Sequence, residues 1–343
     1  MSTAAKTRTS QRSCTVQQII ASYRVSNTTL AATDLLAACT FYLSALALVN
    51  LCLAAEGGAI LWLPTLIVGY VACGLAIAKL FAIQHDCGHD SYFARPYLNR
   101  VLGRACSIVT LVPFTAWREE HLDHHGCFAR LDKHTFGDIL LLTIEQYRSA
   151  PALHRLAYRI FRSPAYLLGL APLGYLLLRQ RVPRELRGKR LRSCASHTAT
   201  IILFYGIIFY FFGSIMLLVF LPPLYVAGVV GIVIFVVEHQ FEQAEWFDQP
   251  TWQFDDAALQ SSSYLSMPIA LEWITGYIGY HHLHHFSPRI PSYHLKGCFL
   301  SLGDSLPCKE ISLLSIPRNL TLALWSRELN KLVTFREANA LTE

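Results

Sequence analysis

Residues 59–82 read AILWLPTLIVGYVACGLAIAKLFA, an apolar run interrupted by a single charge, Lys79. A helix needs about 20 such residues to cross the hydrocarbon core of a bilayer, so this run predicts a membrane span. Three further apolar runs lie at residues 34–53, 197–212 and 214–237. Short turns at residues 54–58 and at Gly213-Ser214 join the four runs in pairs. We therefore predict an all-α membrane protein with four transmembrane helices in two hairpins.

The composition also indicates an integral membrane protein. The chain is 53% hydrophobic and 15% charged, with a mean hydropathy of +0.35, whereas soluble domains carry about a quarter charged residues. Its ten cysteines include no C-x-x-C pair, which excludes a thiolate zinc site of that pattern and a disulfide framework, so we interpret them as reduced thiols. The chain has a net charge of +6, and its basic residues lie beside the spans. This placement favours contact with membrane lipid over nucleic acid.

The distribution of Lys and Arg predicts the orientation of the spans. Apart from Lys79, these residues lie in residues 1–32, 84–195 and 238–343, and none lies in the short turns. The positive-inside rule then places both termini and both polar segments, 84–195 and 238–300, in the cytoplasm. Residues 1–32 lack an apolar core followed by a cleavage site, so we predict a cytoplasmic tail and not a signal peptide. The domain prediction is a tail at 1–32, a membrane domain at 33–300 and a C-terminal cytoplasmic tail at 301–343.

Two shorter apolar segments and one proline pair leave the topology partly open. Residues 101–116 and 165–178 are short for a span and contain Pro or Gly, so we expect them to be interfacial or buried. Four crossings then keep all the polar segments on one side. Pro222-Pro223 is an alternative position for the second turn.

Three histidine clusters lie in the polar segments: HDCGH at 85–89, HLDHH at 121–125 and HHLHH at 281–285. On a helix, positions i, i+3 and i+4 share a face, whereas His282 points about 100° away from its neighbours. Eight imidazoles exceed what one tetrahedral zinc ion needs, and imidazole suits iron as well as zinc. We therefore predict a cytoplasmic helical cap that holds a histidine-ligated di-metal site. The predicted ligands are His85, His89, His121, His124, His125, His281, His284 and His285.

Other polar residues near the clusters have weaker claims. His239, at the end of the fourth span, is the candidate ninth ligand, and a solvated histidine at a helix end is the alternative. Cys87 is interpreted as a small spacer. Carboxylates that could accept the second N–H of a ligating imidazole are Asp86, Asp90, Glu119, Glu120, Asp123, Glu238 and Glu242. The isolated histidines, expected at the surface or the membrane interface, are His134, His154, His197 and His294.

The three clusters, in this order and separated by a transmembrane hairpin, resemble the histidine boxes of the membrane fatty acid desaturases. VEHQFE at 237–242, WITGYIG at 273–279 and SPRIPSYH at 287–294 are similar to the bacterial and plastid omega, or Δ12-type, acyl-lipid branch. The resemblance covers roughly residues 30–300. Asp90 departs from the pattern, because many relatives of this branch have Gly there.

The resemblance implies a non-haem di-iron centre at the cytoplasmic membrane face, held by the eight box histidines and by His239. It implies an oxidoreductase that uses O2 to introduce a cis double bond into an acyl lipid or acyl thioester, with no catalytic residue beyond the metal ligands. An unactivated methylene has no acidic proton and no leaving group, so iron and O2 must supply the oxidant. Because the sequence has no haem, Fe–S or flavin motif, two electrons must come from an external donor of ferredoxin or cytochrome b5 type. The Arg-rich stretch 179–192 could dock such a donor or face anionic lipid.

Three alternatives remain open on the sequence. A hydroxylase, ketolase or acetylenase would share the same scaffold. A membrane zinc protease would use HDCGH in place of HExxH, but Asp86 stands where the general-base Glu belongs and two clusters would be left unused. A non-catalytic metal sensor or transporter would place its ligands at mid-membrane depth, whereas these histidines lie at span ends or in polar segments.

Overall fold

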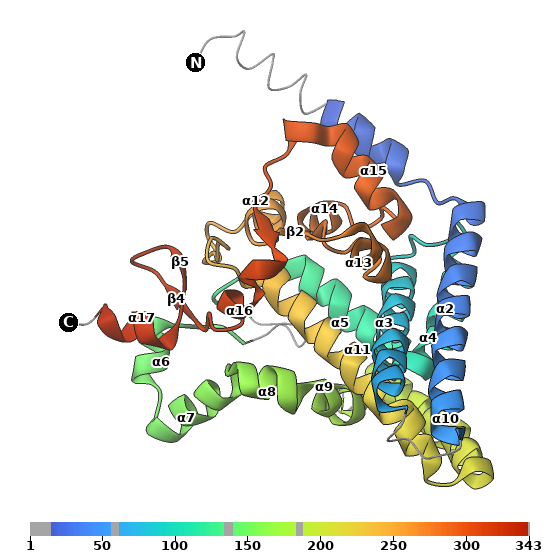
Figure 1. Cartoon of the computed structure of the whole chain (residues 1–343). Helices are drawn as coiled ribbons and strands as arrows, with labels where there is room; N and C mark the ends of the chain where they lie inside the picture. The colour runs from blue at the N-terminus through green and yellow to red at the C-terminus, as the bar shows by residue number, and fades with distance from the viewer. Residues whose placement is uncertain (1–14, 56–61, 134–139, 183–187, 342–343) are drawn as a thin grey trace.

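The frame of the molecule is four helices that are long and apolar enough to cross a membrane (Figure 1). They are α2 (Thr28–Ala54), α3 (Leu63–Gly88), α10 (Gly188–Phe212) and α11 (Ile215–His239). The computed structural model describes residues 15–55, 62–133, 140–182 and 188–341. The predicted fold class, a mostly helical membrane protein with two hairpins of long helices, is confirmed.

At the open end of the first hairpin, both helices extend beyond the apolar runs that predict them. Helix α2 begins at Thr28, because the side chain of Asn27 accepts a hydrogen bond from the Leu30 N–H and caps the helix. Helix α3 continues beyond residue 82 to Gly88 and so includes the start of the first histidine cluster. Most of the predicted turn between the two helices lies outside the described residues.

The second hairpin turns at the predicted glycine. Gly213 has a φ of +63°, a conformation that residues with a Cβ rarely adopt. The alternative turn at Pro222-Pro223 is wrong, because both prolines lie inside α11. Proline is tolerated in a membrane helix when neighbouring groups satisfy the freed backbone. Helix α10 begins at Gly188 and not at His197, since the helix continues through a basic segment that hydropathy alone assigns to the loop.

The segment between the hairpins folds as short helices. Residues 101–116 straddle α4 (Pro96–Thr110) and α5 (Phe114–Cys127), with a break where Leu111 adopts a φ of 58°. Helix α4 packs on α3 and exposes Tyr97, Leu98 and Val101, as expected of an interfacial helix. The chain continues as β1 (Leu142–Thr143), α6 (Ile144–Ser149), α7 (Ala152–Phe161), α8 (Pro164–Gly169), α9 (Ala171–Leu173), the π-helix η1 (Gly174–Leu178) and the 3-10 helix η2 (Arg179–Arg181).

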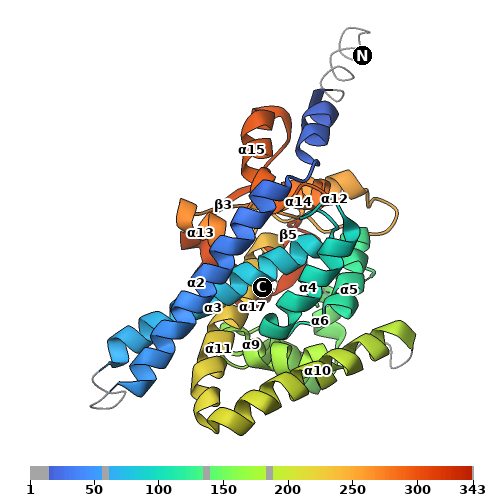
Figure 2. The ribbon, with the colours of Figure 1, turned by 90° about the vertical axis from the view of Figure 1, so that its right-hand side faces the viewer.

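The rest of the chain forms a cap. Residues 254–302 gather near the N-terminal end of α2, and residues 324–340 lie to one side, beside α6 (Figures 1 and 2). Its strands form two small sheets, β1-β4-β5 and β2-β3, which the sequence did not predict because each strand has only two or three residues. The elements are α12 (Phe254–Gln260), β2 (Tyr264–Ser266), α13 (Ile269–Ile274), α14 (His281–Phe286), α15 (Ser292–Leu302), η3 (Gly303–Ser305), β3 (Glu310–Ser312), η4 (Leu313–Ser315), α16 (Ile316–Asn319), β4 (Leu324–Ser326), β5 (Lys331–Val333) and α17 (Phe335–Ala340).

The segments predicted as terminal tails are folded in their described parts. Residues 15–23 are helical, and Ile20 is buried against Leu283 and Leu295. At the other end, Trp325 of β4 is 1% exposed and belongs to the main apolar core of the cap. Both ends of the chain therefore support the cap that carries the third histidine cluster.

Candidate metal centre

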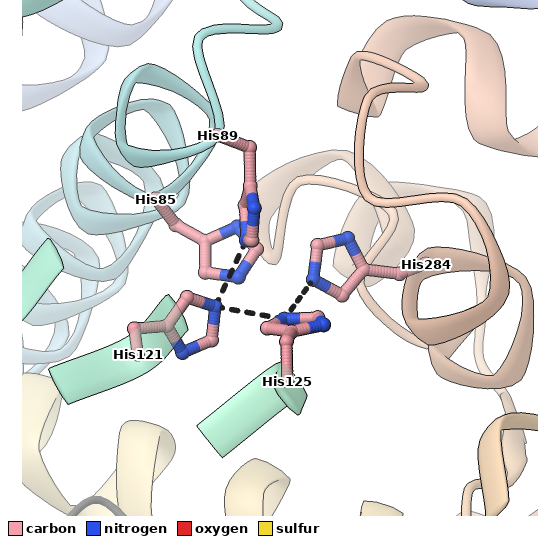
Figure 3. A group of neighbouring side chains, drawn as sticks. All are labelled: His85, His89, His121, His125 and His284. Carbon is pink, nitrogen blue, oxygen red and sulfur yellow. Dashed lines mark hydrogen bonds between the residues drawn. The ribbon is translucent and has the colours of Figure 1, made fainter. Parts of the chain in front are cut away.

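The first site is a five-histidine cluster built from three helices (Figure 3). The C-terminal end of α3 contributes His85 and His89, α5 contributes His121 and His125, and α14 contributes His284. Their candidate ligand nitrogens all lie within 4.8 Å of one another. The Nε2 atom of His121 lies 2.9 Å from that of His89 and 3.1 Å from that of His125, and His125 is 3.1 Å from His284. Five imidazoles from distant parts of the sequence therefore share one centre.

The second site is a three-histidine cluster of His124, His239 and His285, all of them buried. His281 lies beside it: its Nε2 atom is 2.8 Å from Nε2 of His239, and its ring centroid is 4.5 Å from that of His285. The adjacent residues His124 and His125 thus enter different clusters, because neighbouring positions on a helix point about 100° apart. The same division separates His284 from His285.

Burial keeps several of the cluster imidazoles neutral. Burial, reinforced by the neighbouring histidines, holds the pKa values of His121, His125, His284 and His285 well below the usual range. A neutral imidazole has a lone pair available for a metal ion, whereas a protonated one has none. These four imidazoles are therefore in the ligand-competent form at neutral pH.

The carboxylates near the clusters divide into two groups. Glu238 Oε2 lies 3.2 Å from Nδ1 of His281, and Asp86 Oδ1 lies 3.7 Å from Nδ1 of His85 while its other oxygen accepts from the Ser292 N–H. These two oxygens lie beside the imidazole nitrogens as the sequence predicts.

Of the other five predicted carboxylates, Glu120 is buried, and the remaining four form ion pairs with Lys or Arg. Asp90 pairs with Arg118 at 2.5 Å, and Arg118 also donates to the Gly88 carbonyl. Glu119 and Asp123 both bind Arg190 of α10, and Glu242 binds Lys331. These ion pairs hold the helices that carry the histidines. They also engage Arg190, one of the arginines proposed to face a donor or lipid.

The described histidines that the prediction left out lie apart from both clusters. His282 is buried against Phe299, with ring centroids 5.7 Å apart. His154 is exposed, and the ring of His294 lies edge-on to that of Tyr23 with centroids 6.0 Å apart. His134 lies outside the described residues. His197 is half-buried and bonds the Ser107 carbonyl and Arg181. Cys87 is fully buried in an apolar core, which agrees with a spacer role.

Aromatic side chains that the sequence analysis did not single out surround the clusters. Trp117 stacks on His121 with centroids 4.7 Å apart, and Phe128 lies 4.1 Å from His285. Phe128, Phe235 and Trp246 line a small pocket together with His124 and His239. A usable signal was present, because Trp117, Phe128 and Phe235 each lie four residues from a cluster histidine on the same helix or at its end.

The two clusters fit a pair of metal ions. His285 is fully buried, yet neither of its ring nitrogens has a hydrogen-bond partner among the described residues. An unsatisfied buried polar group is costly, and a metal ion would satisfy it. Within the described chain the two groups contain imidazole alone and no thiolate, a donor set that suits iron, zinc or copper.

Comparison with known proteins agrees with this architecture. The sequence profile of the fatty acid desaturase family matches residues 60–300. The chain is 32% identical to a fatty acid desaturase of Bacillus subtilis over 80% of this chain and 78% of that protein. It is 25% identical to the sn-1 oleoyl-lipid 12-desaturase of Synechocystis over 72% of this chain and 71% of that protein. It is 29% identical to the chloroplastic omega-3 fatty acid desaturase of Brassica napus over 66% of this chain and 58% of that protein. With four candidate membrane helices, two histidine clusters and this family match, the chain belongs to the fatty acid desaturase family.

Proposed function

We propose that the protein is an O2-dependent di-iron desaturase that introduces a cis double bond into the acyl chain of a membrane lipid, at a Δ12 or omega position. The observation that carries this proposal is the convergence of nine buried or half-buried histidines in a member of the desaturase family. The relative named an sn-1 oleoyl-lipid 12-desaturase supports an acyl-lipid substrate and the Δ12 position.

The clusters divide the ligands between two iron ions. His85, His89, His121, His125 and His284 would hold one iron, and His124, His239, His281 and His285 the other. When bound, the irons and O2 supply the oxidant that no side chain can provide. Glu238 Oε2 lies 3.2 Å from Nδ1 of His281, so the Nε2 atom of the same ring would remain available for a metal.

Aromatic side chains lie beside the three-histidine cluster. Phe128, Phe235 and Trp246 line a small pocket there and would exclude water from the metal site. The reaction balances if O2 takes two hydrogens from the acyl chain, two electrons from a donor protein and two protons from water, and leaves as two water molecules. We propose an external donor of ferredoxin or cytochrome b5 type, because the sequence has no electron-carrying motif of its own.

The test is the fatty-acid profile of a bacterial host that expresses the wild-type chain or His124→Ala, with a ferredoxin system co-expressed. We expect a new cis double bond in the wild-type strain and none in the variant, and the position of the double bond assigns the regiochemistry. The iron content of the purified proteins is measured in parallel, with about two irons per chain expected for the wild type.

Each outcome has a distinct meaning. A hydroxy acid in place of an olefin would retain the metal site and reject desaturation. A double bond at another position would reject the Δ12 assignment alone. An unchanged profile together with a wild-type protein that binds no iron would reject the proposal.

A further inference from the structure

Helix α7 turns its apolar side away from the protein. Leu153, Leu156 and Ile160 are 76, 55 and 53% exposed, and their spacing places them on one face of the helix. On the other side, Tyr158 is buried, and its hydroxyl donates to the Ala323 carbonyl at 2.6 Å. A water-facing helix has the reverse arrangement, so the exposed leucines need a partner outside the described chain.

The basic residues of α7 bond to neighbouring elements, with Arg155 half-buried and Arg159 exposed. Arg159 donates to the Tyr147 hydroxyl at 2.6 Å, and its guanidinium lies 5.2 Å from the ring centroid of Phe335. Arg155 donates to the Arg148 carbonyl at 3.1 Å. These cations fasten α7 to α6 and to the C-terminal part of the cap. The helix is therefore held rigidly with its leucines outward.

The apolar surface of α7 continues into a segment that lies against a membrane helix. Leu170, which follows α8, and Leu178, at the end of η1, are 73 and 71% exposed. Helices α8 and α9 pack on α11: the Tyr225 hydroxyl donates to the Leu168 carbonyl, and Pro172 lies so close to Gly228 that a Cβ there would be 2.9 Å from the proline. Figure 1 shows α7, α8 and α9 in a row that leads to α11. The exposed stripe is thus continuous with the surface of a candidate span.

We propose that α7 lies in the lipid–water interface and forms a membrane contact in addition to the four spans. Its occupant is the boundary between lipid head groups and acyl chains, the zone in which an amphipathic helix buries an apolar face. Leu153, Leu156 and Ile160 enter this zone, and His154 faces the head groups. The contact anchors the β1-β4-β5 sheet to the membrane surface at the side of the cap opposite α15.

The test places the photoreactive residue p-benzoylphenylalanine at position 156 of the full-length protein in nanodiscs of phosphatidylethanolamine and phosphatidylglycerol. The matched control carries the same residue at Leu300, which is 67% exposed on α15, at the end of the molecule away from the hairpin turns (Figure 2). After irradiation, mass spectrometry identifies what is attached to each labelled peptide. We expect lipid adducts at position 156 to exceed those at position 300 by at least tenfold.

Three results would overturn the proposal. Equal lipid adducts at the two positions would mean non-specific labelling. Adducts of position 156 with a second copy of the chain would make α7 a protein interface. A lack of any adduct at 156 would show that α7 faces water. None of these results depends on which reaction the protein catalyses.

Discussion

Adjacent histidines belong to different clusters of the candidate metal centre. His284 belongs to the five-histidine cluster and His285 to the three-histidine cluster, whereas His282 on the same short helix belongs to neither. All three are buried, so burial does not distinguish a ligand from a packed histidine. The direction of the side chain distinguishes them, because successive residues along α14 point about 100° apart.

This contrast gives a matched pair of variants. We expect His285→Ala to lose about half of the bound metal, because it opens the three-histidine cluster. Desaturation should fall by more than the roughly 10- to 100-fold that loss of an outer-shell partner costs. His282→Gln should retain both metals and most activity, as measured by elemental analysis and product yield. Equal metal loss in the two variants would contradict the division of roles.

His282 also predicts how stability responds to pH. Burial lowers its pKa to about 4, against an ordinary value of 6.5. Between pH 6.5 and about 4, His282 binds a proton in the unfolded chain but stays neutral in the folded chain. The free energy of unfolding should therefore fall as the pH decreases through this range. This single residue accounts for up to about 3 kcal/mol of that fall.

The measurement is chemical unfolding of the detergent-solubilised, metal-free protein at several pH values. His282→Gln should lose stability less steeply over this window than the wild type, while the two should respond alike above pH 7. Parallel curves across the whole range would show that His282 does not carry the effect.

At the scale of elements, a buried network joins the first hairpin to the cap, and an ion pair between α2 and α3 lies at its centre. Lys79 of α3 lies 2.9 Å from Asp34 of α2, and Asp34 also accepts from the Trp273 indole at 2.9 Å and the Tyr92 hydroxyl at 3.0 Å. Lys79 lies 5.0 Å from the centroid of the Trp273 ring. Charges inside membrane helices are expensive, so this network must be satisfied as a unit.

The ion pair can be tested with a double-mutant cycle. Asp34→Asn or Lys79→Met alone leaves one buried charge unpaired and should destabilise the protein by roughly 3–5 kcal/mol. The double variant leaves no charge and should recover most of that loss in thermal unfolding in detergent. Strictly additive losses would show that the two residues do not interact.

A second element-scale prediction concerns the crossing of α3 and α11. A Cβ at Gly74 would lie 2.5 Å from Cβ of Val226 and 2.8 Å from the Pro223 carbonyl oxygen. Gly74→Ala should therefore force the helices apart and cost about 1–3 kcal/mol in thermal unfolding. Gly231→Ala on α11 is the control, because nothing lies within 4 Å of the added methyl and Ala favours a helix. If Gly231→Ala were as destabilised as Gly74→Ala, the loss would reflect any Gly-to-Ala change in these helices and not the close contact at Gly74.

For the whole molecule, the four candidate spans predict where the termini lie. An even number of crossings would place both ends on one side of the membrane, and the charge distribution predicts that this side is the cytoplasm. Green fluorescent protein fused to either end should therefore fluoresce in a bacterial host, and alkaline phosphatase at the same positions should be inactive. A fluorescent fusion at one end alone would indicate an odd number of crossings.

The sequence by itself determined the four long apolar helices and which histidines share a helix face, but it left the second turn open between Gly213-Ser214 and Pro222-Pro223. Apolar length and helical spacing are local properties, so residues near one another in the chain suffice to reveal them. The same local information misplaced the start of α10 and left the short strands of the cap unrecognised, because helix ends and two- or three-residue strands depend on what packs around them.

The tertiary structure alone decided how the histidines divide. His89, His125 and His284 meet because α3, α5 and α14 converge, and His239 joins His124 because α11 ends beside them. Asp90 and Asp123 flank the boxes in sequence, yet in the fold they are paired with arginines. Spacing along a helix states which side chains share a face. Which distant faces meet depends on packing between elements, and packing therefore decides where each metal site forms.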